Sequence, residues 1–351
     1  MLELDEQMSQ QLKKLYKELE SEGKLPSKQQ LSEYYATFRK KFGPDTLANL
    51  DGEALLETMH SHGNKDSLVY WLEFKDDEEF PAIFGSIAGG SAYKFGLFRK
   101  KETGTWTAGS PRNPQELTVE QAIERARHHR DQLIAGADLL ARMPDDGSDR
   151  DYEHLQQALL SIAPNIGDTA WGHKYLSLLY PEKLDDFHNP DYARFHLIKL
   201  LQLPLQPEGR YIAAGRYGVI AHALQIPLPI LTTLLNERDG SNPHNYWRIG
   251  TAKYKSTPRE YWTSMRDGNF CAIGWAEIDD LSSITKDEAG KQALRSALQS
   301  HYQGKAPPAI GNALRQLFDF RWNIAVGDLV LAADGASILD TVSISKGGQG
   351  G

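Results

Sequence analysis

Two acidic residues and a lysine in the first third of the chain are the residue types of a metal-dependent nuclease centre. Asp66 is followed by Glu73 and then by Lys75, the order acid, acid, any residue, lysine. If residues 67–74 form one strand, a rise of about 3.3 Å per residue places the two carboxylates roughly 23 Å apart, too far to share a metal ion. We therefore expect a solvated strand end. A nuclease in residues 60–110 stays as an alternative, which predicts metal-dependent cleavage that Glu73→Ala abolishes.

A glycine-rich segment, residues 85–94, ends in Lys94 and has some features of a phosphate-binding loop. Such a loop needs Gly-Lys-Ser/Thr leading directly into a helix whose amides hold the phosphates. Residues 93–98 alternate like a strand instead, which favours a hairpin turn. The eleven histidines lack the helical pairing or carboxylate partners of a zinc site, including the close pairs His60/His62, His128/His129 and His188/His196. The sequence predicts neither a metal nor another cofactor.

Composition limits the class of protein. The chain of 351 residues has room for two or three domains. Its one cysteine, Cys271, excludes disulfides and thiolate zinc clusters within the chain, and no segment approaches the roughly 20 apolar residues of a membrane span, so we expect a cytoplasmic protein. The net charge is −8, with the acidic excess in residues 1–240 and a slight basic excess in residues 241–351. A protein that coats nucleic acid would be basic overall, so any nucleic-acid contact is local.

The order of elements predicts an α+β fold in three domains, residues 1–143, 144–240 and 241–351. The first combines helices over residues 1–60, broken at Pro26 and Gly43-Pro44, with an antiparallel sheet and a helix that Thr118 caps. The sheet strands are expected at residues 68–74, 82–87, 93–98 and 105–107. The second domain is all-helical, with helices expected at residues 152–163, 169–179, 190–201, 211–224 and 228–236.

The helical middle also carries the densest aromatic patch outside the C-terminal third, Trp171 to Pro181. Its apolar residues recur at helical spacing, so we expect core packing, with a partner groove as the alternative. A protein-interaction adaptor acting through this acidic segment is thus the second alternative function. It predicts a stable partner complex without nucleic acid and indifference to Trp247→Ala.

Large aromatic side chains gather in the last third of the chain. Short strands are expected at residues 246–250, 269–275 and 326–335, which together predict a small β-barrel. The rings either fill the barrel core or form a cage that stacks on an extruded base, since every base offers a π-face. The six rings are Tyr246, Trp247, Trp262, Phe270, Trp275 and Trp322.

These residues carry a family resemblance. Tyr-Trp-Arg-Ile-Gly at 246–250, the Trp-containing segment 260–265, Ala-Ile-Gly-Trp at 272–275 with Asp279-Asp280-Leu281, and Val-Gly-Asp-Leu-Val-Leu at 326–331 together resemble the EVE-like domain of the PUA superfamily. This form occurs near the N-terminus of McrB-like restriction subunits. The upstream blocks at residues 67–80, 84–91, 171–175 and 194–202 resemble the region that precedes it there.

The resemblance implies a specificity module that captures a modified base of DNA, with RNA also open, in an aromatic pocket. Trp247 and Trp275 would be its walls beside Tyr246, and the backbone at Ile249-Gly250 and Ile273-Gly274 would read the base edge. An AAA+ GTPase motor and a McrC-type nuclease would be its partners. The sequence has no Walker motif, and its tail, residues 341–351, departs from the family pattern, so we expect a barrel truncated at its C-terminal end and a chain that is not itself an enzyme.

Overall fold

The chain divides into two compact units, residues 1–243 and 244–351. The computed structural model describes residues 4–80, 83–89, 91–201, 207–240, 243, 245–251, 261–278, 280–324, 328–334 and 337–344. Each unit is described by itself. The predicted mixture of helices and small sheets is present, so the fold class is α+β.

The first unit opens with the expected helices, which begin and end at the predicted breaks. Ser27 and Gln30 form a capping box at the start of the second helix, and Gly43-Pro44 separates the second from the third. The prediction of helices over residues 1–60 is confirmed. The bounds are α1 Glu6–Ser21, α2 Lys28–Phe42, α3 Pro44–Ala48 and α4 Gly52–His60.

The strand predicted at residues 68–74 is wrong, because this segment is helical. It consists of α5 (Leu68–Tyr70), a π-helical turn η1 (Trp71–Lys75) and α6 (Asp76–Glu79). The Ser67 side chain accepts a hydrogen bond from the Tyr70 backbone N–H and caps the helix start. A short apolar run does not distinguish a strand from a buried helix by periodicity alone.

The sheet of the first unit is antiparallel, as expected, but small. Its order is β1 (Leu97–Arg99), β2 (Trp106–Ser110), β3 (Asn113–Leu117), with Leu97 opposite Ala108 and Trp106 opposite Leu117. The strands predicted at residues 93–98 and 105–107 overlap β1 and β2. Residues 83–87 form no strand, and Ala82 lies outside the described residues. The turn η2 (Ala92–Phe95) precedes β1.

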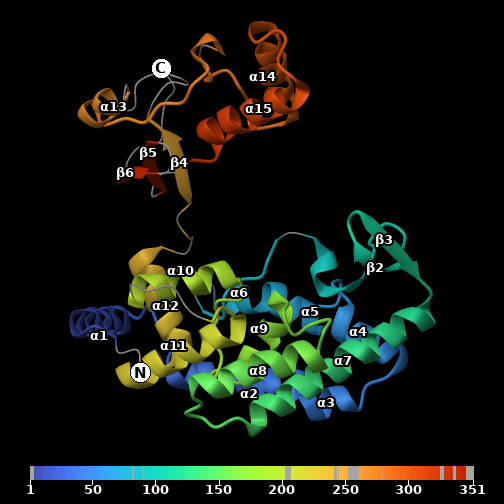
Figure 1. Ribbon diagram of the computed structural model, residues 1–351. Helices are drawn as coiled ribbons and strands as arrows, with labels where there is room; N and C mark the ends of the chain where they lie inside the picture. Colours follow the sequence, from blue (N-terminus) through green and yellow to red (C-terminus); the bar gives the residue numbers. More distant parts are fainter. Residues whose placement is uncertain are drawn as a thin grey trace. The chain divides into compact units, whose positions relative to one another are not determined.

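The helical middle is confirmed, but it shares its core with the N-terminal region. The long helix α7 packs against α4 as well as α8 and α9, which Figure 1 shows. One cluster of buried side chains runs from Leu12 to Leu235, so the predicted boundary between residues 143 and 144 falls inside one unit. The helix bounds are α7 Val119–Arg142, α8 Asp149–Ile162, α9 Ala170–Leu179, α10 Pro190–Leu201, α11 Arg210–Leu224 and α12 Leu228–Asp239.

Every residue from Trp171 to Leu179 is buried, so the aromatic patch of α9 packs in the core.

Within the described ranges, no single helix has the length and apolar character to cross a membrane. The pair α11 and α12, bent by 95° at its break, passes that test only when the two helices are taken together, and both are largely buried in the unit's core.

A group of polar and charged side chains is buried among these helices. Lys174, which is 0% exposed, lies 3.2 Å from Asp76, and the Nδ1 atoms of His173 and His188 are 2.9 Å apart. Burial raises the pKa of Asp185 and of its neighbour Asp186 to about 7 and lowers the pKa of both histidines well below the usual value. We call these groups the buried polar cluster: Tyr34, Asp76, His173, Lys174, Asp185, Asp186, His188 and Arg210.

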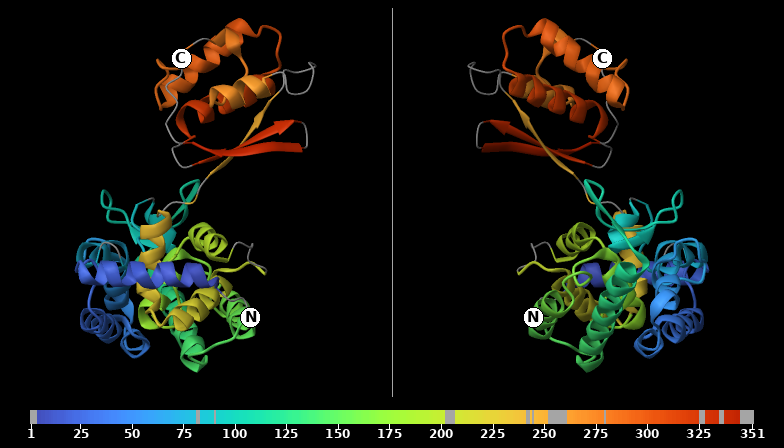
Figure 2. Two further views of the ribbon diagram at one scale, coloured as in Figure 1. Left: turned by 90° about the vertical axis from the view of Figure 1, so that its left-hand side faces the viewer. Right: turned by 90° about the vertical axis from the view of Figure 1, so that its right-hand side faces the viewer.

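The second unit is a three-stranded sheet with helices over one of its faces (Figure 2). β5 lies in the centre, parallel to β4 and antiparallel to β6. The strands predicted at 246–250 and 326–335 are confirmed as β4 and β5, and β6 follows them at Ser337–Ser343. The bounds are β4 Tyr246–Gly250, α13 Trp262–Gly268, η3 Ala276–Ile278, α14 Glu288–His301, α15 Pro307–Trp322, β5 Leu329–Asp334 and β6 Ser337–Ser343.

The predicted strand at residues 269–275 is wrong. Asn269 adopts a left-handed conformation (φ 53°) that ends α13, and the residues after it run as a loop. Within the described residues, the sheet does not close into a barrel. The core of this unit lies mainly between α14 and α15, around Leu294, Leu298 and Leu317. Some of the motif and tail residues lie outside the described residues: Glu260, Asp279, Val326, Gly327 and residues 345–351.

Candidate nucleic-acid interface

The strand β4 presents its residues to two different faces of the sheet. Trp247 and Ile249 lie opposite Val330 and Ala332 of β5, which are 2% and 7% exposed, so their side chains belong to the covered face. The alternate residues Tyr246, Arg248 and Gly250 point to the other face, where each is exposed. We call these three residues the open face of β4.

The indole of Trp247 is fixed by a buried carboxylate. Its Nε1–H donates to Asp328 Oδ2 at 2.7 Å, and the backbone N–H of Asn245 donates to Asp328 Oδ1 at 3.1 Å. Asp328 is only 4% exposed, so the bonds to its charge form away from bulk water. This residue was missing from the predicted site. Its position directly before β5, in parallel register with β4, is the feature that brings it to the indole.

Ile273, Gly274 and Trp275 lie in the loop between α13 and η3. Ile273 and Trp275 pack partly buried against the core of α14 and α15. Trp275 has a left-handed backbone (φ 72°), which a bulky residue rarely adopts, and its carbonyl accepts the backbone N–H of Ile278 at 3.0 Å. Among the described residues, no ring of this unit stacks on another, and Trp247 and Trp275 in particular make no ring contact. The two predicted walls therefore each serve the packing of the unit.

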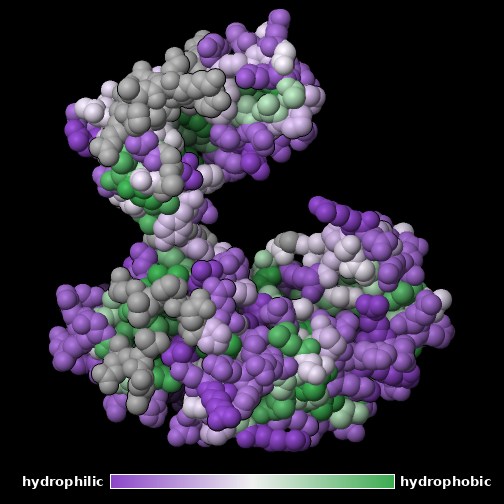
Figure 3. Space-filling model, in the orientation of Figure 1, coloured by the Kyte–Doolittle hydropathy of each residue, from purple (hydrophilic) through white to green (hydrophobic). Residues whose placement is uncertain are grey.

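Three other rings in this unit are more exposed. Tyr246 is 63% exposed, Phe270 53% and Tyr261 42%, and they are the most exposed large aromatic side chains among the described residues. Tyr261 lies next to the end of β4, because its backbone N–H donates to Thr251 O at 3.1 Å. Phe270 follows α13, with its N–H bonded to Met265 O. Figure 3 shows apolar surface over the strands of this unit.

The two predicted backbone positions are open. No described atom lies within 4 Å of a Cβ placed on Gly250 or on Gly274. A planar ligand edge can therefore approach the backbone at either residue, since a glycine leaves no side chain in the way. Neither glycine has a left-handed backbone, so an alanine there is free of the strain that a positive φ imposes.

The acidic residues of the nuclease alternative do not meet. Asp66 binds Lys41 at 2.5 Å, whereas Glu73 is buried and binds Lys94, with His62 at 3.7 Å. Within the described residues, no group of three or more histidine, cysteine, aspartate or glutamate side chains has the arrangement to hold a metal ion.

Lys94 also closes the glycine-rich loop. Its ammonium donates to the carbonyls of Ile87 at 2.6 Å and Gly89 at 2.8 Å, so its donors hold the loop's own backbone. The predicted hairpin turn is instead an irregular loop followed by the short helix η2.

The histidines that contact one another are not always neighbours in the sequence, since His60 contacts His129 at 3.3 Å. Burial raises the pKa of the Cys271 thiol, which disfavours the thiolate.

The second unit is thus a mixed three-stranded sheet backed by helices, with exposed rings at and after β4. A family described as a domain of unknown function (DUF8426) matches residues 247–349, which begins within β4 and spans nearly all of this unit. No curated protein and no solved structure matches the chain.

Proposed function

We propose that the second unit recognises a modified base in nucleic acid, as the specificity module of a McrB-type restriction system. The observation that carries the proposal is the open face of β4, where an exposed ring, a cation and an open glycine lie on one side of one strand. Tyr246 supplies a surface on which a base can stack, a contact worth about 1–3 kcal/mol. Arg248 supplies charge toward a phosphate, and Gly250 exposes backbone to the base edge.

The family relationship is part of the same proposal. The order of the sequence blocks supports assignment to the PUA superfamily, with helices between the first strand and the last two. The resemblance gives Trp247 and Trp275 as walls of the pocket, but Trp247 lies on the covered face of β4, so in this proposal it supports the strand from behind while Trp275 borders the base. The backbone at Ile249 and Ile273 lies beside the base, and a separate AAA+ motor and McrC-type nuclease act on what the module binds. The chain then works in the cytoplasm and catalyses nothing itself.

The experiment measures binding of the full chain to matched oligonucleotides by fluorescence anisotropy at two salt concentrations. The set contains plain DNA and DNA with 5-methylcytosine, 5-hydroxymethylcytosine or N6-methyladenine, and each has an RNA counterpart. We expect a preference of ten-fold or more, about 1.4 kcal/mol, for one modified form. Weak binding that depends on salt alone and ignores the modification refutes the proposal.

Glycine variants locate the site more cleanly than the tryptophans do. Gly250→Ala and Gly274→Ala each add one methyl group in open space, so each variant should fold normally. Each should weaken binding of the modified oligonucleotide several-fold. Gly311→Ala, in α15 of the same unit and equally open, is the matched control and should bind as wild type does. Tyr246→Ala should weaken binding roughly five- to 150-fold, and Phe74→Ala, which removes an exposed ring of the first unit, should leave the affinity unchanged.

A protein-interaction adaptor is the second candidate. It is favoured by two exposed apolar side chains near the end of α8, Leu160 (45%) and Ile162 (41%). It predicts a stable complex with a partner protein that forms without nucleic acid. The double variant Leu160→Ser and Ile162→Ser should disrupt this complex, and Tyr246→Ala should leave it intact. The two functions are therefore separated by reciprocal variants in one set of binding measurements.

A further inference from the structure

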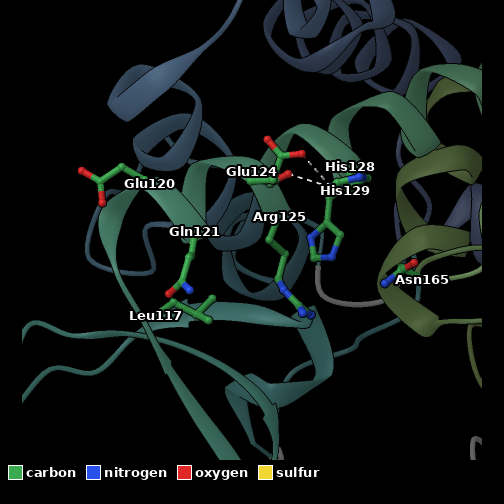
Figure 4. Close-up of a pocket in the computed structure, with 8 residues that line it drawn as sticks. All are labelled: Leu117, Glu120, Gln121, Glu124, Arg125, His128, His129 and Asn165. Carbon is green, nitrogen blue, oxygen red and sulfur yellow. Dashed lines mark hydrogen bonds and ion pairs between the residues drawn. The ribbon is translucent and has the colours of Figure 1, made fainter.

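A hollow of about 590 Å³ lies beside α7 in the first unit, outside every site considered above. Figure 4 shows two rows of side chains on this helix. Gln121, Arg125 and His129, four residues apart, form one row, whereas Glu120 and Glu124 of the neighbouring row leave the helix on another side, although both also line the hollow. The lining residues are Leu117, Glu120, Gln121, Glu124, Arg125, His128, His129 and Asn165.

Arg125 is the unusual member of this group. The residue is partly buried, and its guanidinium has no hydrogen-bond or ion-pair partner within the described ranges. The acids beside it are occupied elsewhere: Glu124 lies 3.4 Å from Arg127 and 3.9 Å from His128, and Glu120 is engaged at the Thr118 cap. The guanidinium, with its N–H donors and positive charge, therefore lines the hollow without a direct ion pair to either glutamate.

Apart from the two glutamates and His128, the other polar groups around the hollow are neutral. The Asn165 carbonyl accepts from Gln132 at 3.1 Å, which leaves its amide NH₂ for the hollow. The Gln121 carbonyl likewise accepts from the Thr118 backbone at 3.0 Å. His129 uses Nδ1 on His60, and burial, with the nearby Arg125 charge, lowers its pKa to about 4, so the ring is neutral at pH 7.

We propose that this hollow binds a small molecule through an oxyanion, either a carboxylate or a phosphate. The planar fork of Arg125 pairs with two oxygens of the anion, and the amides of Gln121 and Asn165 donate to the remaining lone pairs. Leu117 provides an apolar wall, and the volume lies in the range of small-molecule sites, about 300–1,000 Å³. This site is independent of base recognition by the second unit.

The test titrates the full chain with inorganic phosphate and, separately, with succinate. Binding is followed by isothermal calorimetry and by the NMR signals of the His129 ring and the Arg125 Nε–H. We expect saturable binding of at least one anion, with both signals shifting together. Arg125→Gln should weaken binding ten-fold or more, and Arg142→Gln, an exposed arginine at the end of the same helix, should leave it unchanged.

A second variant guards against a folding defect. Asn165→Asp keeps the shape of the side chain and places a negative charge beside the anion, so it should also weaken binding at pH 7 while the circular dichroism spectrum stays that of wild type. The relative affinities for phosphate and succinate identify the kind of oxyanion. Absence of saturable binding by both anions, or equal binding by wild type and Arg125→Gln, overturns the proposal.

Discussion

Replacing Asp328 with alanine is the sharpest test of how the second unit holds its candidate site. The carboxylate accepts the Trp247 indole N–H at 2.7 Å and the backbone N–H and amide of Asn245 at 3.1 Å and 3.3 Å. Asp328→Ala removes all three bonds and leaves the donors of a partly buried strand end without an acceptor. The start of β4 should then separate from the start of β5.

The expected cost follows from the burial of the acceptor. A hydrogen bond to a charged group contributes about 1.5–3 kcal/mol, and bonds that share one acceptor do not add in full. Asp328 is 4% exposed, but Trp247 and Asn245 are less deeply buried, so water replaces part of the loss. We expect a loss of about 2–4 kcal/mol in the unfolding free energy of this unit, or roughly 10–20 °C in its midpoint.

The assay is thermal and urea unfolding followed by circular dichroism and tryptophan emission. Asp328→Asn keeps one acceptor oxygen and should lose less than the alanine variant. Asp340→Ala, which removes an exposed aspartate of β6, is the matched control and should stay within about 0.5 kcal/mol of wild type. A double-mutant cycle with Trp247→Phe isolates the indole bond and should give a coupling of about 1–2 kcal/mol. If Asp328→Ala unfolds with the wild-type midpoint, the anchoring argument is refuted.

Three further predictions concern the first unit, each measured by urea unfolding. Gly85→Ala places a Cβ 1.9 Å from the Asp186 carbonyl at a positive φ and should cost more than about 2 kcal/mol, whereas Gly89→Ala, in open space, should cost about 1 kcal/mol. Lys174→Met leaves Asp76 buried without its cation and should cost about 3–5 kcal/mol, part of which Asp76→Asn in the same chain restores. The histidines of the buried polar cluster have lowered pKa values, so their contribution is lost as pH falls below about 6.5. The aspartates of the cluster have raised pKa values, so their protonation in the folded protein offsets the loss from the histidines as pH falls to about 4. Below pH 4 the offset ends, and the unfolding free energy should then fall most steeply.

The helices were predictable from the sequence because their signals are local. Thr118 and Gln121 form a capping box at the start of α7, and prolines begin or separate the helices of the middle region. The strand prediction for residues 68–74 failed because the β-branched and aromatic residues of this segment favour strands, while only the capping hydroxyl of Ser67 indicated a helix. The capping signal was present in the sequence and outweighs the composition of so short a run.

The site was only partly predictable because its contacts join residues far apart in the chain. The prediction of a strand at β4, with side chains that alternate between the two faces of a sheet, was correct. The sequence does not show which of the two faces the helices cover. That choice depends on β5, which pairs with β4 in parallel register about 80 residues later and places Trp247 opposite the buried Val330. The buried histidines show the same limit: His60 meets His129, a pairing that inspection of neighbouring histidines does not reveal.

The residues with the strongest motif resemblance are consequently poor reporters of function. Trp247 holds the start of the sheet, and Trp275 packs on the α14–α15 core, so an alanine at either position changes folding and binding together. A methyl group added at Gly250 or at Gly274 enters open space, so neither substitution disturbs the packing of the described residues. If base recognition is correct, these glycine variants lose affinity at wild-type stability. If the tryptophans only build the unit, the glycine variants bind as wild type does, and the resemblance reflects a shared scaffold without a shared ligand.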